Sequence, residues 1–157
     1  MRVLVLGAGA VGGYFGGRMA EAGMDVTFLV REKKKRKLEK TGLVIKSPKG
    51  DLSIKPNLVT IDKVGGDFDV ILFTNKAYDL DEILQLPFPV KNRALIIPLL
   101  NGFAHMEQIS KKFLDARLFG GIAHIFSTLS EKGEINHFND IHSLTFGHLS
   151  SADETDG

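Results

Sequence analysis

The chain has 157 residues, of which 43% are apolar and 25% are charged, and its formal net charge at pH 7 is +1. This composition is typical of a soluble globular domain with a substantial core, and the near-neutral charge gives no indication of a nucleic-acid or membrane partner. The absence of cysteine excludes a disulfide framework, a thiolate nucleophile and a cysteine-based zinc site.

The first 31 residues predict a strand, a glycine turn, a helix and a second strand. Residues 2–6 are apolar, GAGAVG follows at 7–12, residues 14–22 have a helical pattern and residues 25–30 that of a strand. This order is typical of dinucleotide-binding folds, where the glycines allow a tight turn, close approach of a pyrophosphate and close helix packing. The helix N-terminus adds free N–H groups and partial positive charge. We therefore expect Gly7, Gly9, Ala10, Val11 and Gly12 to bind the cofactor.

The residue that closes the second predicted strand indicates which dinucleotide is bound. An Asp or Glu about 20 residues beyond the glycines would bind the ribose 2′-hydroxyl of NAD. This chain has Arg31 at that point, and a guanidinium can donate two parallel hydrogen bonds to a 2′-phosphate. Glu32 is the rival candidate, but the neighbouring Lys33 makes the local charge positive. The sequence thus predicts NADP(H) as the cofactor.

The rest of the chain alternates strands and helices. The basic segment 31–37 favours a solvated helix that ends at Gly42, with nucleic-acid binding as the alternative interpretation. Residues 43–46 and 51–55 predict a hairpin, and 58–60 a short strand. Buried strands are predicted at 68–74 and at 94–100, where Pro98 should lie at the strand end. Helices are predicted at 78–86 and 105–113, a strand at 118–125, and antiparallel partners at 134–138 and 143–147.

This alternation predicts an α/β fold: a Rossmann-type, doubly wound, mostly parallel sheet with antiparallel strands near the C-terminus. We assign residues 1–149 to one dinucleotide-binding domain and expect 150–157 to be a disordered tail. Ligands bind at the carboxyl ends of such strands, so segments 7–12, 74–77 and 99–102 should meet at one edge. His124, His137, His142 and His148 follow no metal-ligand spacing, and we expect no metal site.

These segments together resemble the ketopantoate reductase (2-dehydropantoate 2-reductase) family. The resemblance covers residues 1–147 and rests on GAGAVG at 7–12, Arg31, KAY at 76–78 and NG at 101–102. In that family a hydride from NADPH reduces ketopantoate to pantoate, a step toward coenzyme A. The resemblance implies that Lys76 and Asn101 lie near the nicotinamide ribose and the substrate, where both would bind the cofactor and take part in catalysis.

Members of that family are much longer and carry a C-terminal helical domain with the catalytic general acid, a domain that we expect to be absent here. The chain would then be a piece of a longer reductase, a truncated product or a stand-alone binding domain. We expect it to bind the cofactor without useful turnover and to self-associate through the face that such a domain covers. Two alternatives are a non-catalytic NADP-binding module and the cofactor domain of another small 2-keto or 2-hydroxy acid dehydrogenase.

The apolar N-terminus is too short and too rich in glycine for a signal peptide, and no apolar run is long enough to span a bilayer. We therefore expect the protein to be cytoplasmic.

Overall fold

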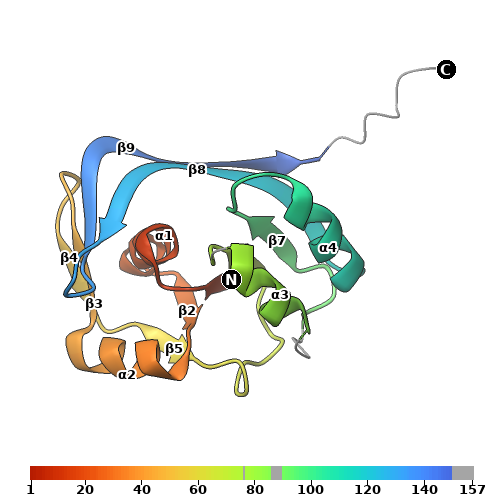
Figure 1. Cartoon of the computed structure of the whole chain (residues 1–157), viewed down its shortest axis with the longest axis horizontal. Helices are drawn as coiled ribbons and strands as arrows, with labels where there is room; N and C mark the ends of the chain where they lie inside the picture. The colour runs from red at the N-terminus through yellow and green to blue at the C-terminus, as the bar shows by residue number, and fades with distance from the viewer. Residues whose placement is uncertain (76, 86–89, 150–157) are drawn as a thin grey trace.

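The computed structural model describes residues 1–75, 77–85 and 90–149 (Figure 1). Lys76 lies outside the described residues. The tail at 150–157, for which the sequence predicts disorder, lies outside them as well. Within the described ranges the chain forms four helices and nine strands, and all nine strands belong to one sheet. The predicted α/β class is confirmed.

The central part of this sheet is parallel and is built around β1 (Arg2–Leu6). β1 pairs with β2 on one side and β6 on the other; β5 flanks β2, while β7 and then β8 extend the sheet beyond β6. The bounds are β2 (Asp25–Leu29), β5 (Asn57–Val59), β6 (Val70–Phe73), β7 (Leu95–Pro98) and β8 (Arg117–Leu129). Pro98 is the last residue of β7, as expected for a residue without an N–H group.

Beyond β8 the sheet becomes mixed. β8 forms a long antiparallel pair with β9 (Ile135–His148), β3 (Leu43–Lys46) runs parallel to β9, and β4 (Leu52–Ile54) closes the predicted hairpin with β3. The prediction of two separate strands at 134–138 and 143–147 was wrong, because both belong to β9. A register shift between Ile125 and Ser127 of β8 lets the pair bend without ending, which a short-strand pattern does not reveal.

The helices cover both faces of the parallel strands, as predicted for a doubly wound sheet. Val3 and Val5 of β1 pack in one core cluster with α1 (Ala10–Glu21) and β3. The alternate residues Leu4 and Leu6 pack in a second cluster with α3 (Ala77–Gln85) and α4 (Ala104–Lys112). The alternation of strand side chains thus divides the apolar residues of β1 between two cores.

Helix α1 is enclosed, because the β8–β9 pair arches over the helix on the side away from the parallel strands (Figure 1). Glycines make this possible: a Cβ atom on Gly16 would lie 2.5 Å from the Phe28 ring of β2, and one on Gly13 would clash with Ile135 of β9. The helix begins at Ala10 rather than at the predicted residue 14, and the Gly13 N–H donates to the Gly9 carbonyl at 2.8 Å. Packing on both sides therefore overrides the low helix propensity of glycine.

Two of the histidines tie β9 to its neighbours. The His137 Nε2–H donates to the Ile141 carbonyl at 3.0 Å, so its Nδ1 accepts the Ser47 hydroxyl at 2.8 Å. The buried Tyr14 hydroxyl of α1 lies 2.6 Å from His142 Nδ1. No group of three or more His, Asp or Glu residues is arranged for a metal ion in the described part of the chain. These contacts make His137 and His142 structural residues of the arch.

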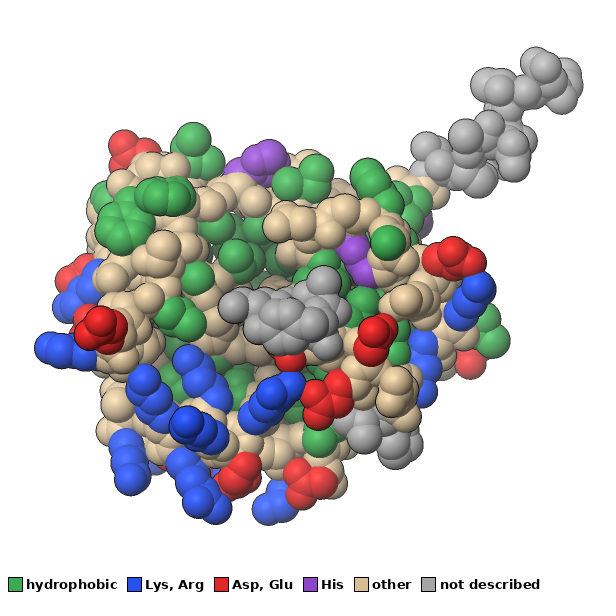
Figure 2. Space-filling view, in the orientation of Figure 1, with side chains coloured by type: hydrophobic (Ala, Val, Ile, Leu, Met, Phe, Trp, Pro, Cys, Tyr) green, Lys and Arg blue, Asp and Glu red, His purple; other side chains and the backbone are tan. Residues whose placement is uncertain are grey.

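Large apolar side chains are exposed on β8 and β9, where Figure 2 shows hydrophobic side chains at the surface; among them are Ile122, Phe126, Phe138 and Phe146. The structure does not test the expected self-association, which stays a prediction. None of the helices described here is both long and apolar enough to cross a membrane.

We predict that Gly16→Val lowers the free energy of unfolding by about 2–3 kcal/mol, because the added methyl groups would overlap with Phe28 and Val5. Urea denaturation measures this loss. Gly65→Val is the matched control, since a Cβ atom there meets nothing within 4 Å and should change stability little. Equal stabilities of the two variants would contradict the close packing of α1.

Candidate functional site

A cavity of about 550 Å³ opens at the carboxyl ends of β1, β2 and β6, beside α3. Its walls come from the glycine turn after β1, the junction between β2 and α2 (Glu32–Thr41), the segment after β5 and one face of α3. The residues that line it are Leu6, Gly7, Ala8, Gly9, Leu29, Val30, Arg31, Glu32, Lys34, Thr60, Ile61, Asp62, Asn75, Asp79, Glu82 and Ile83. This is the edge of the sheet at which parallel α/β folds bind ligands.

The glycine turn forms one wall of the cavity. Gly7 has a φ angle of +103°, which side chains rarely allow, and its N–H donates to the Leu29 carbonyl at 2.9 Å. Gly9 is the N-cap of α1, no side chain caps the helix, and a Cβ atom on Gly9 would meet nothing within 4 Å. The start of α1 therefore offers backbone N–H groups next to open space, an arrangement suited to an anion.

Gly12 acts in packing and does not line the cavity. A Cβ atom there would lie 2.7 Å from the Gly7 carbonyl and would clash with the Thr74 hydroxyl. Thr74 is the residue after β6, and its hydroxyl donates to the Leu6 carbonyl at 2.8 Å. Gly12 thus lets the helix, the turn and the end of β6 meet at one point.

The other two residues predicted in the turn also lie outside the cavity lining. The Ala10 carbonyl accepts a hydrogen bond from Ser127 of β8 at 3.0 Å, and Val11 packs against the first core cluster. Of the five residues predicted here, Gly7 and Gly9 line the cavity.

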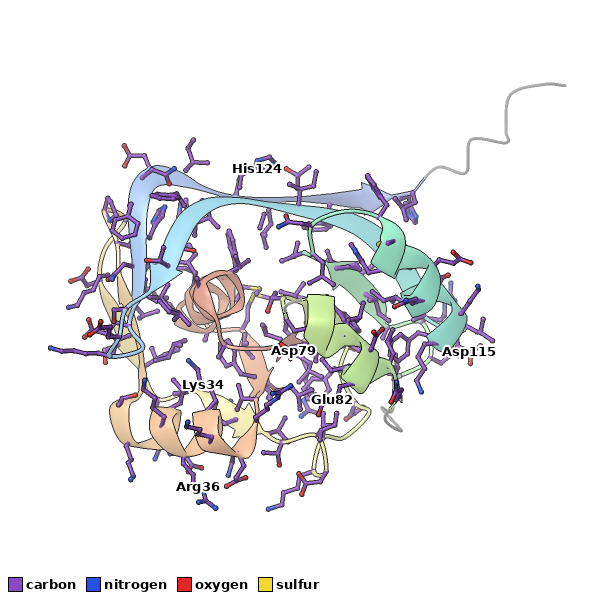
Figure 3. The ribbon with its side chains drawn as sticks, in the orientation of Figure 1. Lys34, Arg36, Asp79, Glu82, Asp115 and His124 are labelled. Carbon is purple, nitrogen blue, oxygen red and sulfur yellow. The ribbon has the colours of Figure 1, made fainter. Side chains whose placement is uncertain are left out.

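Arg31 lines the cavity directly after β2, as the sequence predicts, but its guanidinium is already paired. Its Nη2 donates to Asp79 Oδ1 at 2.9 Å and to Glu82 Oε2 at 2.8 Å. Both carboxylates belong to α3, one helical turn apart, and Figure 3 shows them on this helix. The arginine therefore joins two walls of the cavity that are far apart in sequence.

Lys34 is a second cation of the cavity, one turn into α2. Figure 3 shows it on the side of α2 that faces the molecule, whereas Arg36 points away. Burial, together with the nearby Lys37, lowers the pKa of the Lys34 amine. No ion pair found among the described residues includes Lys34. An anion in the cavity would stabilise its charged form.

Carboxylates outnumber cations around this cavity. Glu32, Asp62, Asp79 and Glu82 are among the described lining residues, against Arg31 and Lys34. A hydrogen bond from Thr60, with one from the backbone, lowers the pKa of Asp62, so this carboxyl is ionised at neutral pH. The excess of negative charge bears on which ligands the cavity accepts.

The structure does not test the roles that the family resemblance assigns to Lys76 and Asn101. Lys76 lies outside the described residues, so its predicted role is untested. Asn101 is exposed in the turn between β7 and α4 and does not line the cavity. Its segment does follow β7, at the predicted edge of the sheet.

Among the charged residues of the cavity, Asp79 and Glu82 were missed by sequence reasoning, and Lys34 was not singled out within the basic segment 31–37, some of whose lysines were considered for the 2′-phosphate. Lys34 follows Arg31 by one helical turn, and Asp79 and Glu82 have the i, i+3 spacing of one helix face. These spacings were available as signals. The contact between α3 and Arg31 was not, because it joins residues 48 and 51 positions apart.

Comparison with known proteins decides the family. The family model described as ketopantoate reductase PanE/ApbA matches residues 3–151. The chain belongs to the ketopantoate reductase family. Membership confirms the resemblance inferred from the motifs.

Individual relatives agree with this assignment. The chain is 46% identical over 149 residues to an uncharacterized oxidoreductase, YkpB, of Bacillus subtilis, covering 94% of this chain and 48% of that protein. It is 32% identical over 136 residues to a 2-dehydropantoate 2-reductase of Pyrococcus horikoshii, covering 86% and 44%. The chain thus spans about half the length of the curated relatives it matches.

A solved structure supports the same fold. The crystal structure of 2-dehydropantoate 2-reductase from Geobacter metallireducens superposes with a TM-score of 0.80 at 26% sequence identity, over 94% of this chain and 49% of that one. The mostly parallel sheet with its antiparallel strands is therefore the Rossmann-type architecture of this family.

Proposed function

We propose that this chain is the cofactor-binding domain of an NADPH-dependent reductase that converts ketopantoate to pantoate. The observation that carries the proposal is the cavity at the strand ends, which has a glycine turn with an uncapped helix start on one wall and two cations, Arg31 and Lys34, on another. The family and the relatives named 2-dehydropantoate 2-reductase support the reaction.

The residues present fit a dinucleotide. The open space over Gly9 leaves room for a pyrophosphate beside the first N–H groups of α1. No side chain caps this end of the helix. Arg31 and Lys34 lie at the end of β2 and the start of α2, where a 2′-phosphate of the adenosine ribose would be bound. In this proposal Gly7 shapes the turn, and Ala10, Val11 and Gly12 hold the helix against it.

When bound, the cofactor supplies the hydride for reduction of the keto group. The chain's own residues have binding roles in this step: the turn at 7–12 fixes the pyrophosphate, and the two cations fix the adenosine end. We assign Lys76 and Asn101 to the nicotinamide ribose and the substrate on the strength of the family motif. In the sequence, each of them follows the end of one of two neighbouring strands, β6 and β7, by three positions, which supports the assignment.

A second candidate is the cofactor domain of a reductase for another small 2-keto acid. The relative that is 46% identical is an oxidoreductase without a stated substrate, and this identity exceeds that to the Pyrococcus enzyme. NADPH oxidation by the protein that carries this domain, measured with ketopantoate, pyruvate and 2-ketoglutarate, distinguishes the two. The first candidate requires the highest kcat/KM with ketopantoate, and a clear preference for another keto acid would favour the second.

We predict that Arg31→Ala weakens NADPH binding by about 1.5–3 kcal/mol, the usual contribution of a hydrogen bond to a charged group, and leaves NADH binding nearly unchanged. Titrations that follow nicotinamide fluorescence measure both affinities. Lys33→Ala is the matched control, because Lys33 is a cation two residues away, at the start of α2, but does not line the cavity. Equal losses for both cofactors would refute the assignment of Arg31 to the 2′-phosphate.

The free energy of unfolding of the Arg31 variant provides a second control. The Arg31 side chain is 71% exposed in both ion pairs, and exposed pairs contribute at most about 1 kcal/mol to stability. A much larger loss would show that the effect on binding is a consequence of misfolding.

A further inference from the structure

The pairing of Arg31 with α3 creates a competition at the adenosine end of the cavity. Asp79 Oδ1 and Glu82 Oε2 lie 2.9 Å and 2.8 Å from the same guanidinium nitrogen, Nη2. A 2′-phosphate that accepts two parallel hydrogen bonds from Arg31 uses Nη2 in either fork of the guanidinium, Nε–Nη2 or Nη1–Nη2, so it competes with these carboxylates for that nitrogen. Arg31 is therefore not a free cation awaiting a phosphate, although its position in the sequence suggests one.

The two cofactors differ in what they bring to this point. NADPH carries a phosphate group on the 2′-oxygen, with a charge of about −1.5 to −2 if it ionises as other phosphate monoesters do. Nearby carboxylates repel that charge at short range, and Lys34 only partly offsets them. NADH carries a neutral 2′-hydroxyl instead, which can donate a hydrogen bond to a carboxylate, as in NAD-binding folds.

We propose that Asp79 and Glu82 are specificity-determining residues, which limit the preference of this site for NADPH over NADH by holding Arg31 and by repelling the 2′-phosphate. The inference rests on the proposed function, since it assumes that the cavity binds a nicotinamide dinucleotide. It deepens that function by assigning cofactor choice to a balance between β2 and α3, two elements on opposite walls of the cavity.

The two carboxylates should contribute unequally. The Asp79 side chain is 26% exposed, whereas that of Glu82 is 64% exposed. Water screens the charge of Glu82 more strongly, so Asp79 should have the larger influence on a bound phosphate. This order provides an internal check on the electrostatic origin of the effect.

The test compares the wild-type chain with Asp79→Asn, Glu82→Gln and the double variant. Affinities for NADPH and NADH are measured by fluorescence titration, and those for 2′,5′-ADP and 5′-AMP by calorimetry, because the latter pair isolates the 2′-phosphate. Asp81→Asn is the matched control: it removes the same charge from the same helix, but Asp81 is exposed and does not line the cavity.

We expect the NADPH-to-NADH affinity ratio to rise roughly three- to tenfold in the double variant, with most of the change in Asp79→Asn and none in Asp81→Asn. The ratio of 2′,5′-ADP to 5′-AMP affinities should rise in parallel. Bound dinucleotide with an unchanged or lower ratio in the double variant would overturn this inference and leave the proposed function intact. Absence of any dinucleotide binding by the wild-type chain would overturn both.

Discussion

The structure depends on how closely α1 approaches the elements around it. Helix α1 lies between the parallel strands and the overlying β8–β9 pair, and the glycines at positions 12, 13, 16 and 17 allow it to approach both closely. Because the Thr74 hydroxyl occupies the space beside Gly12 and binds the Leu6 carbonyl, the ends of β1 and β6 are held against the helix start. The same packing that stabilises the fold therefore positions the glycine turn at the cavity.

The electrostatics of the cavity follow from this arrangement. Once β2 and α3 lie on opposite sides of the opening, Arg31 reaches both Asp79 and Glu82 and its charge is shared between them. Lys34 has a lowered pKa because it is partly buried near another cation, so an incoming anion would stabilise its charged form. Cofactor preference in this site is a balance of opposing charges, and the identity of the residue after β2 is one contribution to that balance.

Much of the fold could be predicted from local patterns, because period-two apolar runs and glycine turns are determined by neighbouring residues. The strands around β1, the hairpin at β3 and β4 and the position of Pro98 all follow from such patterns. The continuous β9 could not, since extra residues of β9 at the register shift, between His137 and His142, interrupt the local pattern while the pairing with β8 resumes beyond them.

In the candidate site, too, residues placed by a local motif could be predicted and residues placed by tertiary contacts could not. Gly7, Gly9 and Arg31 were found because a motif at fixed spacing places them, and the structure locates them at the cavity. Ala10, Val11 and Gly12 belong to the same motif but act in packing, and neither they nor Asn101 line the cavity. Asp79 and Glu82 became visible only when tertiary structure brought α3 to the end of β2.

The central claim is that the cavity at the ends of β1 and β2 binds a nicotinamide dinucleotide. An amide-resolved NMR titration of the isotopically labelled chain with NADPH tests it most directly. The account predicts saturable shifts that are largest at Gly9, Ala10 and Arg31, with weaker changes at Asp79 and none along the outer part of β9. Saturable shifts confined to β8 and β9, with the turn at 7–12 unaffected, would contradict it.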